Sequence, residues 1–229
     1  MQLIENPTFG ITLTLITYYL GIKLKSKKPL IIFHPFLVSS VLIILCLSLF
    51  KIDYETYNLG GKYITYLLQP TVVALAIPMY RKIDLLKKEK FLILITTLAG
   101  SIFGIILVFI LGKITGTSHK LLISMIPKAV TTPVAVEIST EMGGVASLTV
   151  LMVILNGLLG GMFGIKLYEL FNIDSPLARG LSMGISSHGI GTGRILEESK
   201  LEGAVSGLAI GLMGFFTALF APLIINILL

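Results

Sequence analysis

The sequence has few charged residues and a single cysteine. Charged residues make up 13% of the 229 residues, hydrophobic residues make up 55%, and the mean hydropathy is +0.94. Soluble domains carry roughly 25% charged residues, so this composition excludes a water-soluble protein and indicates a chain that lies mostly in lipid. The one cysteine, Cys46, excludes a disulfide within the chain, and no Cys-x-x-Cys pair or Cys/His cluster offers a metal site.

Three further features are missing from the sequence. No Pro/Ser-rich linker or low-complexity tract divides the chain, which predicts one transmembrane domain over residues 1–229. The apolar run 9–22 lacks a preceding basic region and is instead preceded by Glu5, so we expect it to remain as the first span. Ser187 and His188 lack a G-x-S-x-G elbow and a suitable acid, so we discount hydrolysis. We predict no enzyme activity, no catalytic residue and no cofactor.

Long apolar segments fill most of the chain. Each approaches the roughly 20 residues that a helix needs to cross a hydrocarbon core about 30 Å thick. The segments are residues 8–22, 31–50, 63–80, 91–111, 121–140, 145–171, 176–195 and 203–229. We therefore predict an all-α, polytopic integral membrane protein with about seven or eight transmembrane segments.

The net charge is +6, and many of the basic residues lie in two groups within short loops. The groups are Lys23, Lys25, Lys27 and Lys28, and Arg81, Lys82, Lys87, Lys88 and Lys90. This distribution indicates membrane orientation and not a nucleic-acid partner. Because two spans separate the groups, both lie on the cytoplasmic side if the N-terminus is outside. We predict a multi-pass protein of the bacterial cytoplasmic (inner) membrane in that orientation.

Three of the apolar segments contain helix-breaking residues. The breaks are Gln69-Pro70 with Pro78, residues 127–133, and residues 186–193. Membranes tolerate such breaks only where they are buried in protein or face a water-filled cavity. Interrupted segments in both halves point to a transporter site and to candidate inverted repeats, residues 1–112 and 113–229. An inverted repeat needs an odd number of crossings in each half, so we predict that residues 121–140 are re-entrant or half-spanning.

A lysine lies inside the second break. A charge within an apolar segment costs about 2.5–3.5 kcal/mol unless it is paired or hydrated, so Lys128 needs compensation. An anionic substrate would supply it, assisted by the hydroxyls of Thr131 and Thr132 and by N–H groups where a helix restarts near Pro133. Alternatively, Lys128 snorkels to an interface or pairs with Glu137, which is either a proton-coupling carboxylate or a counter-ion.

The third break is rich in glycine. Gly189, Gly191 and Gly193 let an unwound backbone approach a ligand, while Ser187, His188 and Thr192 supply polar contacts. Histidine titrates near pH 6.5, so His188 could bind a carboxylate or accept a proton during transport. The alternative is a neutral histidine that donates to a carbonyl group in the packed core.

Pairs of glycines at four-residue spacing recur on the expected helices. They are Gly100/Gly104, Gly157/Gly161, Gly160/Gly164, Gly180/Gly184 and Gly203/Gly207/Gly211. This spacing predicts close helix packing, within one protomer or between two, and we expect a homodimer surrounded by membrane lipid.

The chain resembles the LrgB/CidB family of bacterial membrane proteins, which also supplies the second half of the plastidic glycolate/glycerate translocator. The resemblance runs from residues 7–14 through residues 35–38 and 73–80. Its most specific parts are residues 127–133, Gly143-Gly144, residues 187–192 and residues 202–209. His34, Gln69 and Ala129 differ from the residues expected there, which bears on fine substrate specificity.

The resemblance implies a secondary carrier of small monocarboxylates such as pyruvate, glycolate or glycerate, working with a smaller LrgA/CidA-type membrane partner. Family members are also described as antiholin-like regulators of murein hydrolase export and cell lysis. The sequence favours transport, because a holin regulator does not need a lysine and a histidine at paired helix breaks. The acid, its direction, and whether H+ or Na+ is the coupling ion stay open.

Our hypothesis is that the second and third breaks converge near the bilayer midplane and bind a carboxylate. The predicted substrate-binding residues are Lys128, Thr131, Thr132, Pro133, Ser187, His188, Gly189, Gly191 and Thr192. His188 and Glu137 are the candidates for proton coupling.

Overall fold

The computed structural model describes residues 6–27, 33–67, 70, 73–74, 76–228, and within them the regular structure is helical with no strand. The chain divides into two compact units, Met1–Ala74 and Leu75–Leu229, which are taken separately below. The helical content agrees with the predicted all-α class. The single-domain prediction and the repeat boundary at residues 112/113 stay predictions.

The described residues of the first unit include the helices α1 (Pro7–Lys27), α2 (Pro35–Leu49) and α3 (Tyr54–Tyr66). Helix α1 packs against both α2 and α3. A Cβ atom on Gly60 would overlap the carbonyl oxygen of Pro7, so glycine permits close contact between α3 and α1. Between α1 and α2, the hydroxyls of Thr17 and Ser39 are hydrogen-bonded at 2.9 Å and buried.

Two predicted spans of the first half have different bounds in the structure. The expected helix over residues 31–50 begins at Pro35, because proline is well accommodated in the first turn of a helix. Residues 63–80 include the end of α3 and most of α5 (Ala76–Arg81), while Gln69 lies outside the described residues. With 13 residues, α3 is about 20 Å long, too short to cross a core of about 30 Å alone.

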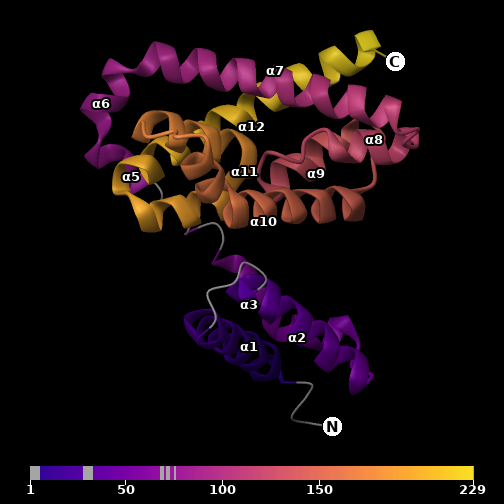
Figure 1. The fold of residues 1–229 in the computed structure, drawn as a ribbon. Coiled ribbons are helices and arrows are strands. Elements are labelled where there is room, and N and C mark those ends of the chain that lie inside the picture. The colour runs from indigo at the N-terminus through magenta and orange to yellow at the C-terminus, as the bar shows by residue number, and fades with distance from the viewer. Residues whose placement is uncertain (1–5, 28–32, 68–69, 71–72, 75, 229) are drawn as a thin grey trace. The chain divides into compact units, whose positions relative to one another are not determined.

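The second unit contains α5 and seven further helices. These are α6 (Ile83–Lys88), α7 (Lys90–Ile114), α8 (His119–Met125), α9 (Thr132–Glu141), α10 (Ala146–Leu170), α11 (Pro176–Glu198) and α12 (Lys200–Leu228). Helices α7 and α10 lie on opposite sides of this unit, with α11 and α12 packed between them (Figure 1). In the described part of the chain, α7, α10 and α12 are long and apolar enough to cross a membrane. These three helices support a helical membrane protein.

Helices α8 and α9 form a hairpin. The backbone N–H of Val145, just after α9, donates to the hydroxyl of Ser124 near the end of α8 at 2.8 Å. The hydroxyls of Ser139 in α9 and Thr149 in α10 are hydrogen-bonded at 2.6 Å. With 7 and 10 residues, the helices are about 10 and 15 Å long, each far shorter than the hydrocarbon core. That residues 121–140 are re-entrant or half-spanning stays a prediction.

Glycines set the spacing around α11. A Cβ atom on Gly157 or Gly160 of α10 would overlap the side chain of His188 or Ser187, respectively. On the α12 side, a Cβ atom on Gly184 would overlap the carbonyl oxygen of Ser206. These contacts confirm that glycine spacing provides close packing within the protomer.

An ion pair joins the beginnings of α11 and α12. Arg179 Nε lies 3.6 Å from Glu202 Oε2, and the side chains are 21% and 6% exposed. The Arg179 guanidinium also lies 5.5 Å from the ring centroid of Tyr168 on α10. This cluster holds three helices together at one end of the second unit.

Replacing Glu202 with alanine should destabilise this end of the protein. The Arg179 guanidinium would lose its counter-charge while remaining partly buried, and we expect the free energy of unfolding to fall by about 1–3 kcal/mol. Thermal unfolding in detergent measures the effect. The control is Glu197→Ala, which removes an exposed partner of Arg194 and should cost less than about 0.5 kcal/mol. Equal shifts for the two variants would contradict a special role for Glu202.

Candidate functional site

The first element of the site is the turn between α8 and α9. Helix α8 ends at Met125 and α9 begins at Thr132, and the intervening turn contains Lys128. Pro127 and Val130 are buried on either side of it, while Lys128 itself is half-buried. Thr131 occupies the position before α9, and its side chain makes no capping hydrogen bond there. The turn therefore presents an ammonium group and a hydroxyl beside the beginning of a helix.

The second element is a kink in α11. His188 has φ 38° and ψ −140°, a backbone conformation inside the helix that residues with side chains rarely adopt. This conformation interrupts the regular ladder of backbone hydrogen bonds in the middle of α11. Backbone groups near the kink consequently need other partners.

The imidazole of His188 contacts α10. Its Nε2 atom lies 2.9 Å from the carbonyl oxygen of Val153, and the residue is buried. Because a carbonyl oxygen only accepts hydrogen bonds, Nε2 is the donor. The ring lies against Gly157, where a Cβ atom would come within 2.5 Å of Nε2. This contact corresponds to the alternative of a histidine that donates to a carbonyl in the packed core.

One amide side chain joins the two breaks. Lys128 Nζ donates to Asn156 Oδ1 at 3.2 Å, and Asn156 Nδ2 donates to the carbonyl oxygen of Ser186 beside the kink. The hydroxyls of Ser186 and Ser187 are hydrogen-bonded to each other at 2.9 Å. Asn156 of α10 thus connects the α8–α9 turn with the middle of α11. The second and third breaks, far apart in sequence, meet at this residue.

Other predicted residues lie away from this connection. The Thr192 hydroxyl is buried and bonded at 2.6 Å to that of Ser206, so it faces α12. Gly191 is also buried, whereas Gly189 is exposed, and a Cβ atom there would meet no atom within 4 Å. Pro133 is exposed in the first turn of α9, while Thr132 is half-buried.

Glu137 does not pair with Lys128. It is exposed on α9. Among the residues that the structure describes, the ion pairs are Arg179–Glu202, Arg194–Glu197 and Arg194–Glu198. The amide of Asn156, and not the carboxylate of Glu137, is therefore the hydrogen-bond partner of the Lys128 ammonium.

Sequence reasoning did not identify Asn156 as a site residue. A signal was present, because Asn156 is an amide in the middle of a long apolar helix, and polar groups in such helices usually bond to neighbouring helices. Ser186 was noted only as part of the glycine-rich break, and its role here comes from its backbone carbonyl.

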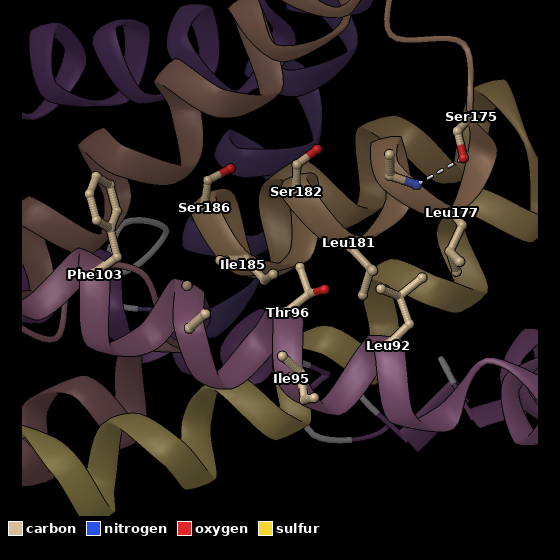
Figure 2. A pocket seen from close by; sticks show the side chains of 13 residues that line it. Leu92, Ile95, Thr96, Phe103, Ser175, Leu177, Leu181, Ser182, Ile185 and Ser186 are labelled. Carbon is tan, nitrogen blue, oxygen red and sulfur yellow. Dashed lines mark hydrogen bonds between the residues drawn. The ribbon is translucent and has the colours of Figure 1, made fainter.

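An apolar groove runs along α11. It lies between α7 and α11, has a volume of about 830 Å³, and includes Leu92, Phe103 and Leu181 in its lining. Figure 2 shows Leu181 and Ile185 pointing toward α7, and Ser186 is also among the residues that line the groove. The residues that line the groove are uncharged, and most of them are apolar.

The fold and site define a helical membrane protein in which a broken hairpin and a kinked helix are linked by polar contacts. The chain belongs to the LrgB-like family, whose sequence profile matches residues 14–227. It is similar to the "Antiholin-like protein LrgB" of Bacillus cereus (strain B4264), with 36% identity over 219 residues, 95% of each chain. The protein of that name from Bacillus anthracis (strain CDC 684 / NRRL 3495) has the same identity and coverage. No solved structure matches the chain.

The comparisons confirm the resemblance drawn from the sequence. The names of the relatives describe them as antiholin-like and do not mention a transported substrate. They therefore favour the regulatory alternative over the transporter reading that the sequence motifs favoured.

Proposed function

We propose that this chain is an antiholin-like membrane protein whose molecular activity is the carriage of a small monocarboxylate. The antiholin-like names of its relatives support the first part, and the family resemblance implies that such a protein regulates murein hydrolase export and cell lysis. The chemistry of the site supports the second part. Lysis control would then follow from the movement of a carboxylate across the membrane.

The connection from Lys128 through Asn156 to the α11 kink carries the transport proposal. It places a half-buried ammonium beside two interrupted helices, with a neutral amide as its partner. The positive charge is consequently still available to an anion. A single ammonium suits one carboxylate, which favours a small monocarboxylate of the pyruvate, glycolate or glycerate class over a dicarboxylate.

Neighbouring groups would complete the binding of such a substrate. The hydroxyls of Thr131 and Thr132 and the N–H groups at the beginning of α9 lie next to the lysine in the chain, and Ser187 follows Ser186 at the kink. His188 would either contact the carboxylate or relay a proton, with Glu137 as the other candidate for proton coupling. Either H+ or Na+ would serve as the coupling ion.

The proposed setting is the bacterial inner membrane with the N-terminus outside. The two basic groups support this orientation because they flank a pair of candidate spans. An LrgA/CidA-type membrane protein is the proposed partner. A homodimer is proposed because Gly104, on α7, meets no atom within 4 Å at the position of a Cβ, which leaves a small-residue surface open to a second copy.

Counterflow in proteoliposomes tests the transport proposal. Vesicles that contain the protein and unlabelled pyruvate, glycolate or glycerate should accumulate the same labelled acid, whereas protein-free vesicles should not. The His188→Gly variant removes the imidazole but suits the positive φ of this position, and we expect it to lower uptake at least about tenfold.

Lysis assays separate the two parts of the proposal. Cells that lack the protein should lyse differently from the parent strain, and a transport-defective variant should not restore the parent behaviour if transport underlies regulation. If the protein takes up none of the three acids and still controls lysis fully, the antiholin-like function stands and the transport proposal is wrong.

A further inference from the structure

We infer that Asn156 is the positioning residue that holds the Lys128 ammonium against the α11 kink and keeps the site positively charged. The inference rests on the proposed carriage of a monocarboxylate. It assigns a function to a residue of α10, a helix that contains neither of the two breaks.

The hydrogen bonds fix how the amide is oriented. Lysine only donates and a backbone carbonyl only accepts, so Oδ1 of Asn156 must face Lys128 and Nδ2 must face Ser186. The reverse orientation would place two donors together at the lysine and two acceptors together at the kink. Both ends of this one side chain are therefore specified by the two broken elements that it joins.

The chemistry of lysine makes such a partner necessary. A lysine side chain is a flexible four-carbon stem with a compact charge, and it can take many positions unless an acceptor fixes it. The acceptor here stands on α10, whose Gly157 and Gly160 bring it close to α11. The ammonium is thus directed toward the kink by a helix that packs directly on it.

The neutrality of asparagine matters as much as its shape. Aspartate could accept a hydrogen bond from Lys128 at the same place, but its charge would cancel that of the ammonium. It would also present an acceptor to the carbonyl oxygen of Ser186, which needs a donor. Alanine would remove both contacts without changing the charge of the site.

Two substitutions at Asn156 separate positioning from structural support. In the proteoliposome assay, Asn156→Ala should raise the KM for pyruvate about tenfold and change the maximal rate less than about twofold, because a hydrogen bond to a charged group is lost. Asn156→Asp should lower kcat/KM at least about 100-fold, because the anionic substrate meets a neutralised and acidic site. Leu155→Ala, at an exposed neighbouring position on α10, is the matched control and should match the wild type.

The pattern of losses in the two variants decides the inference. A residue that only supports the kink would lower the maximal rate and the thermal stability of Asn156→Ala without raising the KM about tenfold, and that result would overturn the inference. Wild-type kinetics in both variants would overturn it while leaving carriage intact. If the wild type carries no monocarboxylate and none shifts its thermal unfolding, carriage fails, and the inference falls with it.

Discussion

Replacing Lys128 with alanine is expected to lower the initial rate of monocarboxylate uptake at least about 100-fold. Lys128 is half-buried and its ammonium lies beside Asn156, where a substrate carboxylate would gain a charge-assisted hydrogen bond with little competition from water. Removing one partner of a buried hydrogen-bonded charge pair typically costs about 2–5 kcal/mol, or roughly 30-fold to several thousand-fold in affinity. Uptake of labelled pyruvate into proteoliposomes at matched protein content measures the loss.

A second lysine provides the control for charge alone. Lys166 is also on a helix of the second unit, but it is exposed, and Lys166→Ala should leave the uptake rate within about twofold of the wild type. Lys128→Arg keeps the charge while changing the geometry of the donors, so it should retain part of the activity. If Lys128→Ala transports as fast as Lys166→Ala, the proposed anion site does not exist.

The membrane character and the interrupted helices could be predicted because both are local properties. Apolar composition over a whole segment determines that α7, α10 and α12 suit lipid. Pro127 follows the end of α8 and Pro133 lies in the first turn of α9, which are positions that suit proline because it cannot donate a backbone hydrogen bond. The prediction of a break at the lysine turn therefore needed no knowledge of tertiary structure.

The partner of Lys128 could not be predicted in the same way. Lys128, Asn156 and Ser186 are far apart in the sequence and meet only because α10 packs against both the hairpin and α11. Sequence reasoning considered Glu137 because it was the nearest intramembrane charge, but helix α9 carries it to an exposed position. Which polar groups meet depends on helix packing, which periodicity alone does not specify.

Local sequence patterns also could not predict where the helices of the first half begin and end. Helix α3 contains Tyr54, Glu55 and Lys62, so it is not apolar enough to be predicted as a span, and the predicted segment 63–80 includes only its last residues. Its ordering comes from contact with α1, where Gly10 and Gly60 let the two backbones approach. Tertiary contact thus forms a helix that hydropathy does not indicate.

The second large effect is expected from a substitution at Gly184, where α11 packs on α12. A Cβ atom there would overlap the carbonyl oxygen of Ser206 and lie 2.8 Å from the Cβ of Ala209, so the obstacle includes backbone that cannot rotate away. We expect Gly184→Leu to lower the free energy of unfolding by at least about 3 kcal/mol, at or above the upper end for overpacked cores. Thermal unfolding in detergent is the measurement.

Gly211 on α12 supplies the matched control, because a Cβ atom there would meet no atom within 4 Å. Gly211→Leu should change stability by less than about 1 kcal/mol, and it should do so favourably, since leucine is a better helix former than glycine. The two variants make the same chemical change, so a difference between them measures the helix contact itself. Separation of α11 from α12 would also break the bond between Thr192 and Ser206, just beyond the kink. Gly184→Leu should therefore abolish uptake even where some folded protein remains, whereas equal stability of the two variants would contradict the close packing of α11 on α12.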